Sequence, residues 1–138
     1  MTKREQYRNV INMYFSTILG YTITKIHPSG FFYLDKNGDE KSVYSELGRG
    51  SLSTLSSIPH SYKGHEVSVM VARSDFYVAI FPEMNIICIG RPKKLRLWLA
   101  SSRSQWMLNE DEKGVSWISV KPKLLTEMFD KVQKLDKK

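Results

Sequence analysis

The segment from Arg91 to Arg103 contains the densest group of side chains that could do chemistry. It holds five lysines and arginines and no aspartate or glutamate, and Trp98 lies among them. Cations neutralise phosphates and aromatic faces stack on unpaired bases, so this composition predicts a nucleic-acid-binding surface. The predicted binding residues are Arg91, Lys93, Lys94, Arg96, Trp98 and Arg103, with Arg49 and Lys63 as extensions of the same surface.

Leucines alternate with other residues in the middle of this segment, which predicts a β-strand over residues 94–99. Successive side chains of a strand point to opposite faces. Lys94, Arg96 and Trp98 are therefore expected to share an exposed face, with the intervening leucines turned towards the core. A charged edge strand that resists aggregation gives the same pattern, and this is the structural alternative to a binding face.

Zinc and thiol chemistry receive little support from the sequence. Zinc needs three or four ligands, and the candidates are His27, His60, His65 and Cys88, of which only His60 and His65 are close in sequence. Cys88 lies in an apolar run, where we expect a buried core thiol and nothing that lowers its pKa. We therefore expect no metal site, no cofactor and no catalytic cysteine.

Acidic turns imitate two other kinds of metal site. Residues 35–46 partly match a calcium-binding loop, but Gly38 comes earlier than such a loop requires, and a β-hairpin explains the same residues. A metal-dependent nuclease needs carboxylates at neighbouring strand ends together with a lysine. Two sets of turn residues imitate it: Glu83 with Asp111 and Lys113, and Asp39 with Lys41. Nuclease activity is therefore a third functional hypothesis, and no residue is assigned as catalytic.

Length and charge restrict the class of protein. The chain has 138 residues, which fits a single domain, and its 21 Lys and Arg against 14 Asp and Glu give a formal charge of +7. A strongly basic balance is typical of domains that bind polyanions. The single cysteine, a polar N-terminus and the lack of a long apolar run predict a cytoplasmic protein without a membrane span.

The elements that would position these residues are short strands between two helices. Apolar residues at helical spacing predict an N-terminal helix over residues 3–19, and Pro122 suits the first turn of a C-terminal helix. Asn37-Gly38 predicts a tight hairpin turn. The Ser- and Gly-rich stretch 47–61 is expected to be a long surface loop. Further strands are expected over residues 21–26, 31–34, 41–45, 66–72, 76–81, 85–90, 105–108 and 115–120.

The middle of the chain resembles the small DNA-associated β-barrel that follows the catalytic domain of some insertion-sequence transposases. The resemblance rests on the order of Pro59, Gly64, Val67, Val69, Val78, Ile80 and Phe81 and covers about a quarter of the chain. The transposase catalytic core is absent. The resemblance implies a small barrel in this region.

The sequence thus predicts one α+β domain over residues 1–138. Its expected architecture is an antiparallel meander or a small curled β-barrel of about six to eight strands, flanked by an N-terminal and a C-terminal helix. The leading functional hypothesis is a small, non-catalytic nucleic-acid-binding protein with a regulatory or accessory role. The alternative is a protein-interaction module, an inhibitor or adaptor of the kind encoded by phages and mobile elements, that docks on an acidic surface of a larger machine.

Overall fold

The computed structural model describes residues 3–27, 31–50 and 54–134 and contains two β-sheets. Sheet A has six strands, in the order β1 (Thr22–Ile26), β2 (Phe31–Lys36), β3 (Asp39–Leu47), β6 (Phe76–Phe81), β7 (Ile86–Gly90) and β10 (Lys131–Lys134). Sheet B has four strands, in the order β5 (His65–Glu66), β4 (Ser56–Tyr62), β9 (Val115–Val120) and β8 (Trp106–Glu110). Helices accompany both sheets, so the predicted α+β class is confirmed.

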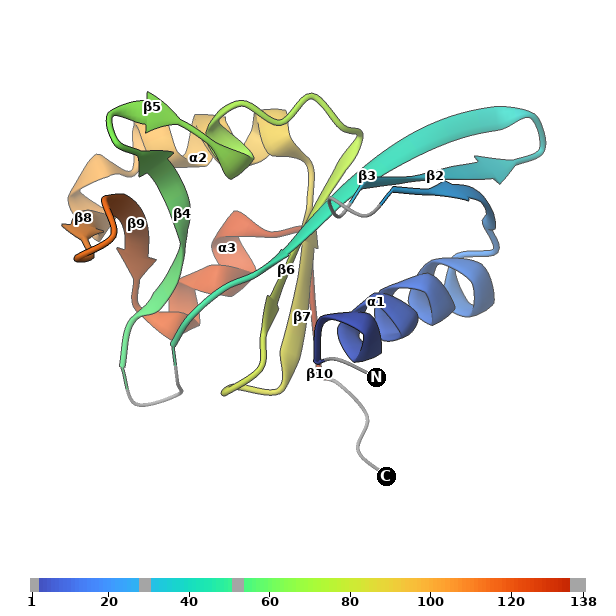
Figure 1. Ribbon diagram of the computed structural model, residues 1–138, viewed down its shortest axis with the longest axis horizontal. Coiled ribbons are helices and arrows are strands. Elements are labelled where there is room, and N and C mark those ends of the chain that lie inside the picture. Colours follow the sequence, from blue (N-terminus) through green and yellow to red (C-terminus); the bar gives the residue numbers. More distant parts are fainter. Residues whose placement is uncertain (1–2, 28–30, 51–53, 135–138) are drawn as a thin grey trace.

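The helices are few and short. They are α1 (Lys3–Met13), which continues as the π-helical turn η1 (Tyr14–Ile18), α2 (Pro92–Ser101) and α3 (Leu125–Met128), with 3₁₀ turns η2 (Ser68–Met70), η3 (Arg103–Gln105) and η4 (Pro122–Leu124). Figure 1 shows α1 on one side of sheet A, with sheet B, α2 and α3 on the other. Among the residues that the structure describes, no helix is long and apolar enough to cross a membrane.

The central strands β6 and β7 of sheet A are buried on both faces. Tyr77 and Phe81 of β6 belong to the core shared with sheet B, α2 and α3, while Val78 and Ile80 belong to the core beneath α1. A strand that is buried on both faces is apolar at nearly every position, without alternation. For this reason β6 and β7 appear in the sequence as continuous apolar runs, and the prediction of both strands is confirmed.

Both predicted hairpins are present. Asn37 and Gly38, with φ of 56° and 82°, form the turn between β2 and β3, and Lys36 lies opposite Asp39. Only a few residue types tolerate such positive φ angles, and Asn-Gly is the pair that favours them in a tight turn. Strands β8 and β9 pair antiparallel from Trp106–Val120 to Glu110–Ser116.

The meander breaks between β3 and β6, which pair in parallel from Val43–Phe76 to Leu47–Ile80. A parallel pair requires a long crossover connection, and this one contains β4 and β5 of sheet B. β1 and β10 are the outer strands of sheet A, so neither the curled barrel nor the barrel implied by the transposase resemblance is formed. The central strands 76–81 and 86–90 belong to a mixed open sheet.

Two segments of the crossover differ from the predictions. The expected loop 47–61 contains strand β4, and Arg49 makes an antiparallel bridge with Ser57; residues 51–53 lie outside the described residues. The expected strand over 66–72 is wrong, because η2 replaces it after the two-residue strand β5. Ser68 has a φ of 58°, which turns the chain out of the extended conformation at this point.

The predicted strand over residues 94–99 is also wrong, because these residues belong to helix α2. Pro92 occupies the first turn, where its fixed φ favours a helix and its missing N–H costs nothing. Leu95 and Leu99 are 0% and 2% exposed, whereas Leu97 is 64% exposed. A spacing of four residues places Leu95 and Leu99 on one helical face, and Leu97 lies away from it.

The C-terminal helix is much shorter than expected. Pro122 begins the 3₁₀ turn η4 and α3 ends at Met128, after which β10 pairs antiparallel with β7. The apolar residues Leu124, Leu125, Met128 and Phe129 are buried, as a helical face would require. Val132 packs against the same core from β10. The apolar pattern therefore identifies the buried residues, but the chain changes from a helix to a strand halfway along it.

Candidate functional site

The predicted basic surface on 91–103 does not form a single exposed face. Arg91 and Lys94 both pair with Asp130, with Arg91 Nε 2.9 Å from Oδ2 and Lys94 Nζ 2.6 Å from Oδ1. The Arg91 guanidinium, and with it the Lys94 ammonium, lowers the pKa of Asp130 against the opposing effect of burial. Lys93 is exposed beside them. Part of the positive charge of this segment is therefore neutralised within the protein.

The side chains of Arg96 and Trp98 make their contacts within the protein. The Arg96 guanidinium donates hydrogen bonds through Nη1 to the carbonyl oxygens of Val69 and Ala72, at 3.0 and 2.8 Å. Trp98 is partly buried and packs against the core between the sheets. The expectation that Lys94, Arg96 and Trp98 share an exposed strand face is thus wrong, because the helix directs Arg96 and Trp98 towards the protein.

The remaining predicted residues lie on sheet B, where two arginines each cover a tryptophan. The Arg103 Cζ atom lies 4.1 Å from the ring centre of Trp106, and Arg49 Cζ lies 4.1 Å from that of Trp117. Arg103 Nη1 also donates to the Trp106 carbonyl oxygen at 2.8 Å. Contacts of this kind hold a guanidinium flat against an aromatic face.

A groove follows the face of sheet B that points away from the core. Strand alternation places Trp117 and Ser119 of β9 on this face, whereas Ile118 faces the core. Two hollows of about 420 and 370 Å³ lie here side by side, and Leu55 and Ser119 line both of them. We call this the open-face groove; its lining includes Arg49, Ser57, Asn109 and Trp117 at one end and Trp106, Met107, Lys121 and Lys123 at the other.

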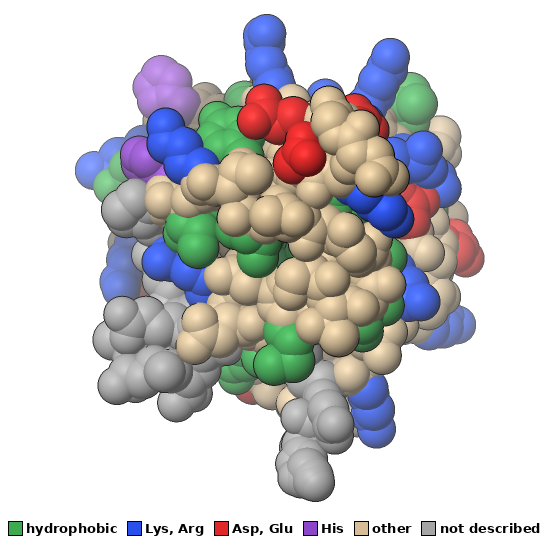
Figure 2. Space-filling view, turned by 90° about the vertical axis from the view of Figure 1, so that its right-hand side faces the viewer, with side chains coloured by type: hydrophobic (Ala, Val, Ile, Leu, Met, Phe, Trp, Pro, Cys, Tyr) green, Lys and Arg blue, Asp and Glu red, His purple; other side chains and the backbone are tan. Residues whose placement is uncertain are grey.

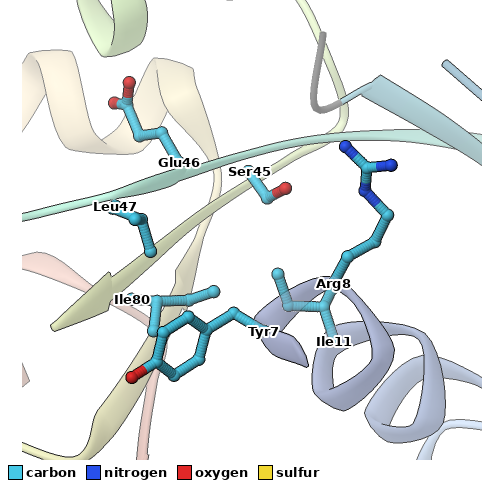
Figure 3. Close-up of a pocket in the computed structure, with 7 residues that line it drawn as sticks. All are labelled: Tyr7, Arg8, Ile11, Ser45, Glu46, Leu47 and Ile80. Atoms are coloured by element: carbon cyan, nitrogen blue, oxygen red, sulfur yellow. The ribbon is translucent and has the colours of Figure 1, made fainter. Parts of the chain in front are cut away.

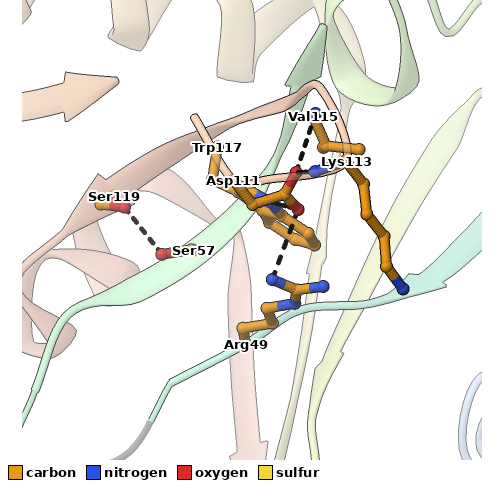
Figure 4. Close-up of polar contacts among 7 residues, drawn as sticks. All are labelled: Arg49, Ser57, Asp111, Lys113, Val115, Trp117 and Ser119. Carbon is orange, nitrogen blue, oxygen red and sulfur yellow. Dashed lines mark hydrogen bonds and ion pairs between the residues drawn. The ribbon is translucent and has the colours of Figure 1, made fainter. Parts of the chain in front are cut away.

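The Trp117 end of the open-face groove is fixed by Asp111 (Figure 4). Asp111 Oδ1 accepts from the backbone N–H groups of Lys113 and Val115 at 2.9 and 3.0 Å, and Oδ2 accepts from Trp117 Nε1 at 3.0 Å. The Trp117 indole N–H and the Val115 amide lower the pKa of Asp111, with smaller contributions from Lys113 and Arg49. Arg49 Nη1 lies 3.6 Å from Oδ2, so Asp111 balances the charge of Arg49.

The other end of the open-face groove is basic. Lys121 and Lys123 line it, and no carboxylate is among its lining residues. The Trp106 ring that Arg103 covers packs against the core, and its Nε1 donates to the Leu99 carbonyl oxygen at 2.8 Å. The sequence carries a signal for Lys121, because Trp117, Ser119 and Lys121 alternate along one strand and its extension. The expected C-terminal helix conceals this signal, because it would place Lys121 and Lys123 on the surface of that helix. Trp117 is not among the predicted binding residues.

Lys63 lies near the Asp111 end of the open-face groove. Its backbone N–H donates to the Gly114 carbonyl oxygen at 2.9 Å, which joins the β4–β5 turn to the β8–β9 turn. Its Nζ lies 5.3 Å from the ring centre of Tyr62. The structure therefore brings Arg49 and Lys63 to the same hairpin turn, and neither of them extends the segment 91–96 as predicted.

On the face that carries α1, the described charged side chains lie mainly at the rim (Figure 2). Figure 2 shows Lys and Arg side chains around the rim of this face, with a largely uncharged middle. A hollow of about 250 Å³ lies between α1 and sheet A, lined by Tyr7, Arg8, Ile11, Ser45, Glu46, Leu47 and Ile80. In Figure 3 the carboxyl group of Glu46 points away from Tyr7 and Arg8, to the other side of β3. The Glu46 carboxyl group is therefore directed out of this hollow (Figure 3).

On that other side, Glu46 is the centre of a cluster of hydroxyl groups. Ser68 Oγ and Tyr77 Oη donate to Oε2, and Tyr44 Oη lies 3.4 Å from Oε1. Burial raises the pKa of the Glu46 carboxyl group, and the three hydroxyls oppose this rise only in part. Within the described part of the chain no cation pairs with Glu46.

Glu46 should make the protein less stable as the pH rises. A carboxyl group whose pKa is higher in the folded than in the unfolded chain stabilises the fold fully below the unfolded pKa, near 4.5, and this stabilisation is lost as the pH rises through the folded pKa. Glu46→Gln should therefore lose less stability than the wild type between acid and neutral pH, as measured by urea unfolding. Glu127→Gln on α3 is the exposed control, and parallel pH profiles for Glu46→Gln and the wild type would contradict the expectation.

The metal and thiol candidates are not assembled into sites. Among the described residues, no group of three or more His, Cys, Asp and Glu side chains is placed to hold a metal ion. Cys88 is buried, as predicted, and burial raises the pKa of its thiol to about 12. Asp111, one carboxylate of the nuclease hypothesis, accepts hydrogen bonds from its own hairpin and pairs with Arg49.

Three comparisons, with protein-family models, with curated proteins and with solved structures, find no significant match to this chain.

Proposed function

We propose that the protein binds single-stranded nucleic acid along the open-face groove. The observation that carries this proposal is that two neighbouring hollows lie along this face of sheet B, one beside Trp117 with Arg49 held on its ring and the other lined by Lys121 and Lys123. Unpaired bases stack on aromatic rings and on guanidinium planes, and an antiparallel sheet face is a common platform for them. An arginine already held against a tryptophan presents its outer plane to a base without further ordering.

The two ends of the open-face groove would play different parts. Lys121, Lys123 and Arg103 supply positive charge where no carboxylate lines the groove, so this end would take phosphates. At the Trp117 end the charge of Arg49 is balanced by Asp111, and Glu110 also lines the groove. That end is better suited to an uncharged base than to a phosphate.

Reversing the two lysines should weaken binding and its dependence on salt. Lys121→Glu with Lys123→Glu should reduce affinity for a mixed-sequence single strand by about tenfold or more and lower the slope of log K against log salt by about 1 to 2. Fluorescence anisotropy with labelled single-stranded DNA, single-stranded RNA and duplex DNA at several salt concentrations measures both quantities.

The matched control is Lys131→Glu with Lys134→Glu. Both lysines lie on β10, an outer strand of sheet A, neither of them lines the open-face groove, and the change in net charge is identical. A specific groove predicts a small loss for this control, whereas equal losses would mean that net charge alone drives binding. Absence of salt-dependent binding to any of the three nucleic acids would refute the proposal and leave a protein partner as the function to test.

A further inference from the structure

A second hollow, apart from the open-face groove, adjoins the Glu46 cluster. It measures about 370 Å³ and is lined by Phe31, Tyr44, Ser68, Val71, Ala72 and Arg73. The Phe31 and Tyr44 rings lie 5.2 Å apart and form an aromatic wall, which stacks in turn on Tyr77. The hollow is large enough for a molecule of amino-acid size, and most of its surface is apolar.

Ser68, which lines this hollow, is an acceptor of hydrogen bonds. Its hydroxyl hydrogen is directed to Glu46, so its oxygen can only accept from a ligand. The Glu46 carboxylate lies directly behind it and has no cation among the described residues. A positively charged donor is the group that would satisfy both, because a buried carboxylate without a cation is costly.

The position of Ser68 is built rather than incidental. Its φ of 58° is uncommon for a residue other than glycine, asparagine or aspartate. Arg96 fixes the turn by donating to the carbonyl oxygens of Val69 and Ala72, and Tyr77 Oη lies 3.3 Å from Ser68 Oγ. Strained backbone that is held by its surroundings concentrates at binding sites.

Arg73 supplies the same hollow with a donor of hydrogen bonds. It is exposed, it lines the hollow, and it has no ion-pair partner within residues 3–27, 31–50 and 54–134. A guanidinium donates hydrogen bonds and accepts none, and it pairs well with carboxylates. The ligand should therefore carry an anionic acceptor beside Arg73.

We propose that this hollow binds a free amino acid with an apolar side chain, its ammonium group at Ser68 and Glu46 and its carboxylate at Arg73. The aromatic wall of Phe31 and Tyr44 would contact the side chain, and an aromatic face also favours a nearby cation. The inference is independent of nucleic-acid binding, because it uses no residue of the open-face groove.

Three probes test the ammonium and carboxylate contacts separately. L-phenylalanine carries both charged groups, phenethylamine lacks the carboxylate, and 3-phenylpropionate lacks the ammonium. Calorimetry or ligand-observed NMR with the wild-type protein should show phenylalanine binding about tenfold or more tighter than either analogue, since a charge-assisted hydrogen bond is worth about 1.5–3 kcal/mol. No binding of any probe at millimolar concentration, or equal binding of all three, would overturn the proposal.

Two variants then assign each charged group of the ligand to its contact in the protein. Glu46→Gln should weaken phenylalanine and phenethylamine by about tenfold and leave 3-phenylpropionate unchanged, whereas Arg73→Gln should weaken phenylalanine and 3-phenylpropionate and leave phenethylamine unchanged. Arg73 is exposed, so its variant should fold even if Glu46→Gln does not. Arg103→Gln, outside this hollow, is the control and should change none of the three affinities. Weakening of the same single-charge analogue in both variants would contradict the assigned orientation.

Discussion

Leu95→Ala should lower the free energy of unfolding by about 2–5 kcal/mol, while Leu97→Ala should change it by less than about 0.5 kcal/mol. Leu95 is 0% exposed and lies in the core between the sheets, so truncation leaves a cavity that its neighbours fill only in part. Leu97 is 64% exposed and loses little contact. Leu99, at 2%, should behave like Leu95.

This comparison separates the helix from the strand predicted for the same residues. On a strand the three leucines would share one face, and their truncation would cost similar amounts. On α2 the middle leucine points to solvent, and only the outer two support the core. Urea unfolding followed by circular dichroism measures all three variants, and a loss at Leu97 comparable to that at Leu95 would contradict the helix.

Residues 94–99 also show why this element could not be read from local pattern. Leucines at 95, 97 and 99 satisfy an alternating pattern, and those at 95 and 99 also satisfy a helical one. Pro92 followed by strong helix formers favours the helix. A pattern that fits both periods is decided by packing, and the packing partners of α2 lie far away in sequence, on η2, sheet B and α3.

Elements with a local cause were predictable. The β2–β3 turn depends on two residues, Asn37 and Gly38, that tolerate positive φ, and β6 and β7 are uninterrupted apolar runs. The parallel pairing of β3 with β6 has no such cause. It depends on a crossover that leaves sheet A, builds part of sheet B and returns, and no short stretch of sequence encodes that path.

The sequence identifies the cationic residues of the site but not which of them face solvent. Charge density singled out Arg96 and Arg103 alike, but Arg96 donates to buried carbonyl groups while Arg103 lies over Trp106. The difference arises from the direction in which α2 points each side chain. Arg49 precedes β4 and Trp117 lies on β9, so the two residues are far apart in the sequence and only the folded sheet brings them together.

The end of β3 connects the cluster at Glu46 to the open-face groove of sheet B. β3 carries Tyr44 and Glu46 towards the hydroxyl cluster, and the chain directly after it carries Arg49 to Trp117. Gly48 lies between them, where its N–H donates to the Ile80 carbonyl oxygen at 2.7 Å. A change at Gly48 should therefore affect both the stability of sheet A and the position of Arg49.

Gly48→Ala should destabilise the protein by about 1–3 kcal/mol, because it overfills a packed site. A β-carbon at this position would lie 2.5 Å from Cε1 and 2.9 Å from Cδ1 and Cζ of the Phe81 ring, and Phe81 is 0% exposed. The φ of Gly48 is not positive, so the cost should be steric and not conformational. Affinity for single-stranded nucleic acid should fall in the same variant if Arg49 contributes to the groove.

Phe81→Leu provides the decisive comparison, since a smaller side chain makes room for the added methyl group. The double variant Gly48→Ala with Phe81→Leu should be more stable than the sum of the single effects by about 0.5–3 kcal/mol. Gly38→Ala is the matched control, because its φ is 82° and nothing lies within 4 Å of the added carbon. Its cost should be purely conformational, about 1–2 kcal/mol, and Phe81→Leu should not relieve it. Strict additivity of Gly48→Ala and Phe81→Leu in urea unfolding would mean that this ring does not limit the site, and that the end of β3 is held by its hydrogen bond to Ile80 alone.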